Sequence, residues 1–251
     1  RNFDISVNNE IIPFSKNYTF ASTGYQIIKF ILYGELRMEK MFKEIDSLIS
    51  VEMYTSKNIQ ILSIASAFES CSNFNFFNMS GFDTSQIKSI SKLFYNTEID
   101  SLEGFNFDTK NVQDFSFFFA NTKINEINLS KLNTNKALNM SHMFADCSYI
   151  TSLDFSNFIT KGVQDMSYMF KSSQGLSNLD LSFFDTSNVK NMSGMFSDCM
   201  SLTNINLQSF DTNKVEDMSS MFDNCCSLTS LNLGNFKTNN VKYMGKMFKY
   251  C

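Results

Sequence analysis

Hydrophobic residues recur along this chain at a nearly constant interval. One phenylalanine returns every 26 residues, or 25 on two occasions, and defines the Phe column: Phe42, Phe68, Phe94, Phe119, Phe144, Phe170, Phe196, Phe222 and Phe248. Two further columns, one and four residues before it, contain 12 of the 15 methionines. A fixed period of this length is typical of repeat proteins, in which each turn packs on the next. The pattern therefore predicts about nine stacked turns.

Each turn combines two shorter periodicities. One set of apolar residues has the i, i+3, i+4, i+7 spacing of a short helix face: Met192, Met195, Phe196 and Cys199. Ile205 and Leu207 then alternate with polar residues, as in a half-buried strand. We therefore expect parallel strands near residues 153–155, 179–181, 205–207 and 231–233. Short helical turns are expected near residues 192–199 and 218–225.

The motif Phe-Asp-Thr follows several of these strands. Its threonine defines the Thr column: Thr84, Thr109, Thr134, Thr160, Thr186, Thr212 and Thr238. Local hydrogen bonding at a corner explains both Asp and Thr in such a motif. We favour this reading over two alternatives, namely paired-carboxylate catalysis by the aspartates and ice binding by a threonine array.

The segment from Leu176 to Cys199 reads Leu-x-x-Leu-x-Leu-Ser-x-Phe-Asp-Thr-Ser-x-Val-x-Asn-Met-Ser-x-Met-Phe-x-x-Cys. It resembles the 26-residue repeat of BspA-like leucine-rich-repeat surface proteins, and the resemblance extends over about residues 36–251. Members of that family are mostly described as surface or adhesive proteins. The resemblance and the periodicities together predict an α/β fold. This is a leucine-rich-repeat-type solenoid with a parallel sheet on one face, short helical turns on the other, and about nine turns of 25–26 residues.

Residues 1–35 do not fit the repeat. Phe3, Ile5 and Val7 alternate with polar residues, Asn8-Asn9 is typical of a turn, and residues 25–32 read as another strand. We expect residues 1–35 to cap the first turn, because solenoids need covered ends. Residues 36–251 would then form the solenoid, with no C-terminal cap visible in the sequence. Further turns, a separate partner or an end-to-end contact with another copy are expected to cover its last turn.

Composition excludes several functions. The net charge is −4 and basic residues do not cluster, which argues against a nucleic-acid partner. No apolar run is long enough to span a membrane. The six cysteines form no Cys-x-x-Cys pair and His142 is the single histidine, at a position expected to be exposed. The sequence therefore predicts no enzymatic activity, with no catalytic, cofactor-binding or metal-binding residues and no cofactor.

Five of the cysteines share one position, three residues after the Phe column. This Cys column holds Ile45, Cys71, Thr97, Thr122, Cys147, Ser173, Cys199, Cys225 and Cys251. Because the position also accepts Ile and Ser, we interpret it as a packing position for small residues. We expect Cys199, Cys225 and Cys251 to be reduced and stacked in the interior.

Polar residues next to the buried strand positions are expected to point to solvent in one ladder. This strand face is the candidate partner-binding surface: Glu103, Asn128, Asp154, Asp180, Asn206, Asn232, Asn178 and Asn204. A sheet kept soluble by polar side chains explains the same pattern. We predict a non-enzymatic protein-interaction module for adhesion or recognition, at the cell surface or outside the cell. The alternative is a structural scaffold or end-to-end building block, in a matrix or in the cytoplasm or cytoskeleton of a protist.

Overall fold

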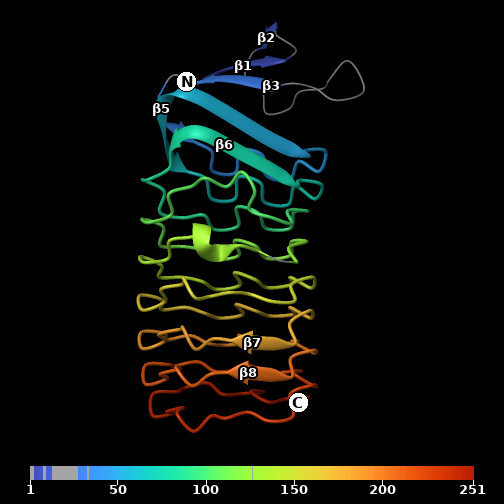
Figure 1. The fold of residues 1–251 in the computed structure, drawn as a ribbon, viewed down its shortest axis with the longest axis vertical. Helices are drawn as coiled ribbons and strands as arrows, with labels where there is room; N and C mark the ends of the chain where they lie inside the picture. The colour runs from blue at the N-terminus through green and yellow to red at the C-terminus, as the bar shows by residue number, and fades with distance from the viewer. Residues whose placement is uncertain (1–2, 8–9, 13–27, 33, 126) are drawn as a thin grey trace.

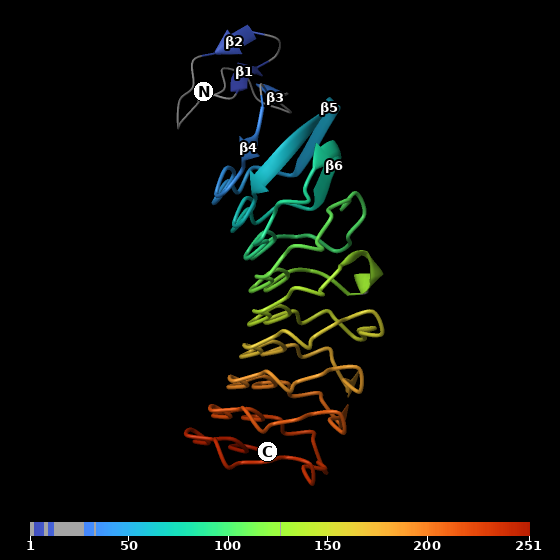
Figure 2. The same cartoon turned by 90° about the vertical axis from the view of Figure 1, so that its left-hand side faces the viewer.

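The computed structural model describes residues 3–7, 10–12, 28–32, 34–125 and 127–251, and side chains from residue 34 on except those of residues 54, 56–58 and 126. From about residue 36 the chain winds into a stack of similar coils, with the two ends of the chain at opposite ends of the stack (Figure 1, Figure 2). The turn predicted at Asn8-Asn9 and the first part of the strand predicted at residues 25–32 lie outside the described residues.

Backbone hydrogen bonds join each coil to the next. The amide of Phe170 donates to the carbonyl of Met195 at 3.0 Å, and the amide of Phe196 donates to Met221 at 2.9 Å. Single parallel bridges continue from coil to coil at another position: Ser89, Asp114, Asn139, Asp165, Asn191, Asp217 and Tyr243. These contacts satisfy backbone groups that a buried chain must pair.

The predicted fold class is wrong, because the segments expected to be helical are not. Gly194 and Asp198 have φ values of 58° and 61°, in the left-handed region that interrupts a right-handed helix. Their amides donate to Ser219 and Asp223 in the next coil, both at 2.8 Å, instead of to residues four positions earlier. Each segment is thus a pair of tight turns. The only helix among the described residues is the 3-10 helix η1 (Leu129–Lys131), so an α/β solenoid with helical turns does not describe this chain.

Strands are shorter and fewer than the periodicity predicts. β7 (Asn178–Asp180) and β8 (Asn204–Asn206) pair in parallel, with Leu179 opposite Ile205. Residues 153–155 and 231–233 follow the same path without forming a strand. Inward Leu and Phe side chains, rather than a continuous sheet, therefore define most of this face.

The N-terminal end is built differently. β4 (Leu36–Arg37), β5 (Ser50–Ser63) and β6 (Phe76–Asp83) form a parallel sheet in the order β4-β5-β6, which curls over that end of the stack (Figure 1). β1 (Phe3–Val7), β2 (Glu10–Ile12) and β3 (Ile28–Leu32) form a separate antiparallel sheet in the order β2-β1-β3, beyond the first coil (Figure 2). The division into a cap at residues 1–35 and a repeat region at residues 36–251 stays a prediction.

The core is a ladder of stacked side chains. Phe144, Phe170 and Phe196 are fully buried, with ring centroids 5.8 Å apart and interplanar angles of 3°. The two methionine columns lie beside them, and Met192 and Met195 are 0% exposed. Each ring packs on identical neighbours, so a coil buries its apolar residues only against the coils on either side.

The last coil presents part of its apolar columns to solvent, although Met247 stays buried. Met244 is 45% exposed and Phe248 48%, whereas the equivalent Met192 and Phe196 are 0% exposed. Phe248 still stacks on Phe222 at 5.7 Å. The same residue types therefore form core in one coil and surface in the last.

The Thr column joins successive coils at one corner. Thr186 is buried, its Oγ1 accepts the amide of Asp211 at 2.8 Å, and its hydroxyl donates to the Asp211 carbonyl at 3.0 Å. Thr134 makes the same pair of bonds with Ile159. Six threonines of the column are buried and only Thr238 is exposed, so the column does not form an exposed ice-binding array.

Candidate binding site

The strand face lies where the sequence placed it, at the solvent side of the coils. Seven of its eight residues are exposed, and Asn206 is half-buried. Asn178 and Asp180 come from β7, and Asn204 and Asn206 from β8. The remaining four come from coils without a strand at this position: Glu103, Asn128, Asp154 and Asn232.

Five of these side chains also hydrogen-bond the backbone two residues ahead, a role that the sequence pattern did not predict. Asp154 Oδ1 accepts the amide of Ser156 at 2.9 Å, and Asp180 Oδ1 accepts the amide of Ser182 at 3.0 Å. Asn128, Asn206 and Asn232 make the same bond to the amide two residues ahead. These are Asx turns, and the signal for them is an Asp or Asn in the same position of every coil from the fourth onward.

The turns also set the acidity of the two aspartates. Hydrogen bonds from the amide and the side chain of Ser156 lower the pKa of Asp154, and those of Ser182 lower the pKa of Asp180. Both carboxylates are therefore ionised near neutral pH. The amide hydrogen bond of each turn is made to Oδ1 of the carboxylate.

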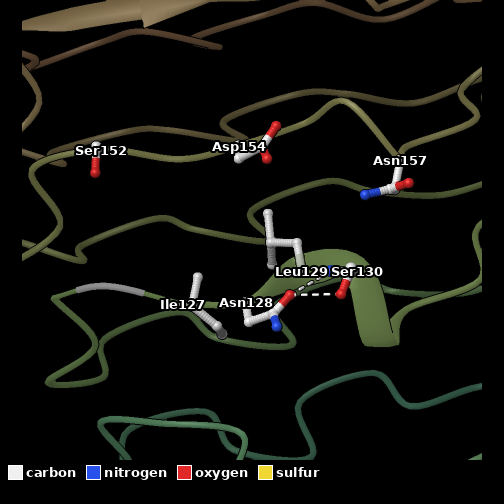
Figure 3. Close-up of a pocket in the computed structure, with 7 residues that line it drawn as sticks. All are labelled: Ile127, Asn128, Leu129, Ser130, Ser152, Asp154 and Asn157. Atoms are coloured by element: carbon white, nitrogen blue, oxygen red, sulfur yellow. Dashed lines mark hydrogen bonds between the residues drawn. The ribbon is translucent and has the colours of Figure 1, made fainter.

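The structure brings together only some of the predicted residues. Asn206 Nδ2 donates to Asp180 Oδ1 at 3.2 Å across β7 and β8. Asn128 and Asp154 line one pocket of about 470 Å³, in which Ser130, Ser152 and Asn157 supply further polar groups (Figure 3). Glu103 and Asn232 belong to other coils and do not line this pocket.

The pocket lies where a short coil meets a long one. From the Cys column to the Thr column, the chain takes 12 residues between Thr122 and Thr134 but 13 between Cys147 and Thr160. The shorter segment turns into η1, with Asn128 as its N-cap, while the next coil continues along the face. The two paths diverge on either side of the hollow (Figure 3). The two 25-residue intervals in the Phe column mark the short coils, but the hollow itself depends on backbone geometry.

The prediction that His142 is exposed is wrong. It is half-buried, and its ring lies between Phe117 (centroids 4.1 Å apart) and Tyr168 (4.8 Å). Its Nδ1 is buried without a hydrogen-bond partner in the described part of the chain. Burial lowers the pKa of His142; Lys171 and Lys92 also lower it, and Asp165 and Asp146 oppose them.

This environment predicts a pH dependence of stability. Below about pH 6.5 the unfolded chain binds a proton at His142 that the folded chain resists, so the free energy of unfolding falls until the pH passes the lower folded-state pKa. We expect urea unfolding from about pH 7.5 to about pH 5 to show a larger loss for the wild type than for His142→Tyr. Tyrosine suits this position, because Tyr168 has the same conformation in the next coil, with φ of 56°. Parallel pH profiles for the two proteins would contradict the prediction.

The Cys column is a hydrogen-bonding position as well as a packing position. Sγ of Cys199 donates to the carbonyl of Phe170 at 3.0 Å, and Cys225 bonds in the same way to Phe196. Ser173 makes the equivalent bond to Phe144 at 2.6 Å, which explains why serine is accepted here. The predicted burial is confirmed for Cys199 and Cys225 but is wrong for Cys251, which is exposed.

These thiols should differ sharply in reactivity. Burial raises the pKa of Cys147 to about 11 and that of Cys199 to about 12, so neither supplies thiolate near neutral pH. A thiol reagent should modify only the exposed Cys226 and Cys251 in the native protein, and all six cysteines after denaturation without reductant. Mass spectrometry of the modified peptides counts the modified cysteines in the native and in the denatured protein. Fewer than six modified thiols in denaturant would show a disulfide, and rapid native labelling of Cys199 would contradict its burial.

The described residues contain no group of three or more His, Cys, Asp or Glu side chains placed to hold a metal ion. In the same part of the chain, no helix has the length and apolar character needed to cross a membrane. What the geometry does offer is a polar face with one pocket at residues 127–130 and 152–157.

Comparison with known proteins identifies a family whose function is unknown. Four overlapping segments match the profile described as Mycoplasma protein of unknown function, DUF285: residues 36–101, 62–180, 97–202 and 149–251. No curated protein and no solved structure matches the chain. The resemblance to BspA-like repeats stays a prediction.

Proposed function

The chain belongs to the family described as Mycoplasma protein of unknown function, DUF285; because that description assigns no activity, we propose from its surface that it is a non-enzymatic binding module. One observation supports this proposal most directly. Asn128 and Asp154, two residues of the strand face, line the same pocket, where polar groups surround a hollow of about 470 Å³. This volume is within the usual range of about 300–1,000 Å³ for ligand sites.

The coils suit this role because they hold the face in a fixed shape. Five residues of the strand face are locked into Asx turns, so their side chains are ordered before a partner arrives. Ordering side chains in advance reduces the entropy that binding must overcome. We propose that the partner is a protein or glycoprotein met at the cell surface or outside the cell.

A test must remove charge from the face without disturbing the turns. Asparagine replaces aspartate naturally at this position in other coils, as Asn128 and Asn206 show. We therefore expect the double variant Asp154→Asn, Asp180→Asn to keep the melting temperature and to weaken partner binding by about tenfold, since hydrogen bonds to charged groups contribute about 1.5–3 kcal/mol. The full chain is immobilised, captured proteins are identified, and each is purified and its Kd measured.

The matched control changes the same residue type at another corner. Asp185 and Asp211 accept the amides of Ser187 and Asn213 in equivalent Asx turns, but they lie beside the Thr column. Asp185→Asn, Asp211→Asn should leave partner binding unchanged. Equal weakening by the two double variants, or capture that neither variant alters, would reject the strand face as the binding surface.

A further inference from the structure

Polar side chains line the pocket from two coils. Asp154 Oδ1 accepts the amide of Ser156, and Asn128 Oδ1 accepts both the amide and the hydroxyl of Ser130. The hydrogen bonds of the Asp154 carboxylate run to Ser156 and those of the Asn128 amide to Ser130, so both side chains stay bonded within their own turn. Asp154 and Asn157 lie on one side of the hollow, and Asn128 and Ser130 on the other (Figure 3). Donors and acceptors therefore face the same space from two coils.

The charges of the pocket select against anions. Asp154 is the only ionised group that lines it, and the lowered pKa of this carboxyl keeps it negative. The nearest lysine in the sequence, Lys131, directs Nζ to the carbonyl of Leu102 at 3.2 Å, in an earlier coil. A phosphate, sulfate or carboxylate would thus meet a carboxylate in a pocket that no Lys or Arg lines. The pocket fits a neutral ligand that both donates and accepts hydrogen bonds.

Apolar side chains lie among these polar groups. Ile127 lines the pocket and is half-buried, and Leu129 lines it as a buried residue. A ligand with both an apolar face and polar edges therefore matches the lining.

We propose that this pocket binds one neutral saccharide residue of a glycan. Neighbouring hydroxyls of a sugar each donate and accept, as the two amides, the carboxylate and the serine hydroxyls of the pocket require. The C–H face of the ring packs against Ile127, and a hollow of about 470 Å³ holds one such ring. The inference rests on the proposed function, because it names the ligand class of the strand face.

The test is amide NMR of the full chain with the methyl glycosides of glucose, galactose, mannose and N-acetylglucosamine as probes. At least one glycoside should shift the signals of residues 127–130 and 152–157. Asp154→Asn keeps the Asx turn and should weaken the binding of that glycoside about tenfold, because one acceptor loses its charge. Ser152→Trp places a large ring at an exposed position beside the hollow and should abolish the shifts. Asp185→Asn, the same substitution at another corner, should change nothing.

Two results would overturn the inference. The first is that none of the four glycosides shifts these signals. The second is that sodium phosphate shifts them while the glycosides do not, which would mean an anion site. If either occurs while Asp154→Asn, Asp180→Asn still weakens a purified protein partner, the saccharide is wrong and the proposed function stands. If that double variant also leaves the binding of every partner unchanged, both the saccharide inference and the proposed function are rejected.

Discussion

Phe196→Ala is expected to lower the free energy of unfolding by about 3–5 kcal/mol, the usual cost of removing a buried phenylalanine ring. Phe196 is 0% exposed and lies between two parallel rings, with centroids 5.8 Å from Phe170 and 5.3 Å from Phe222. Its loss leaves a cavity that the ladder cannot close, because the spacing of the coils is fixed by backbone hydrogen bonds. Urea unfolding followed by circular dichroism measures the change.

Phe183→Ala provides the control. Phe183 lies half a repeat before Phe196 in the sequence, but its side chain is 54% exposed. Its removal should therefore change the free energy of unfolding by no more than about 0.5 kcal/mol. A similar loss for both variants would mean that the Phe column is no more important to the core than a surface ring, and would contradict the ladder.

Thr186→Val should destabilise the chain by about 1–3 kcal/mol, although valine has nearly the shape of threonine. The hydroxyl is the acceptor for the Asp211 amide and the donor to the Asp211 carbonyl. Valine would leave both groups without their partner at a buried corner, which costs their desolvation. Urea unfolding gives the stability, and hydrogen exchange should accelerate at the Asp211 amide.

Thr186→Ser separates this effect from packing. Serine keeps the hydroxyl and loses only a methyl group, so it should destabilise less than valine and keep the Asp211 amide protected. If serine proves as damaging as valine, methyl packing rather than hydrogen bonding determines the Thr column.

The sequence predicted which residues are buried but not the conformation between them. Met192, Met195 and Phe196 are all in the core, as the i, i+3, i+4 spacing indicated, yet the segment is a pair of tight turns. Two successive turns with a left-handed residue every fourth position bring the same side chains inward as one face of a helix. A clue was present two residues after the Phe column, where Asn and Asp, which tolerate this conformation, are frequent: Asn96, Asn121, Asp146, Asp198 and Asn224.

For the strand face, too, the sequence predicted the exposure of the residues but not their local conformation. Alternation with buried residues was sufficient to place Asp154 and Asp180 at the surface. Their turns, and the hollow between Asn128 and Asp154, depend on where the chain bends after each inward residue. The burial of His142 between Phe117 and Tyr168 could not be inferred from spacing alone, because its column also contains Lys and Gly.

The unequal coil lengths have an evolutionary consequence. Loss of 26 residues in phase would return every column to its place, so recombination between repeats can shorten or lengthen the stack without rebuilding its core. A stretch one residue shorter than its equivalents occurs twice, between Thr97 and Thr109 and between Thr122 and Thr134, and the ladders on both sides stay aligned. The second stretch carries Asn128 and forms one wall of the pocket. Single-residue insertions and deletions in such stretches would therefore reshape the surface of the stack while its core columns stay in place.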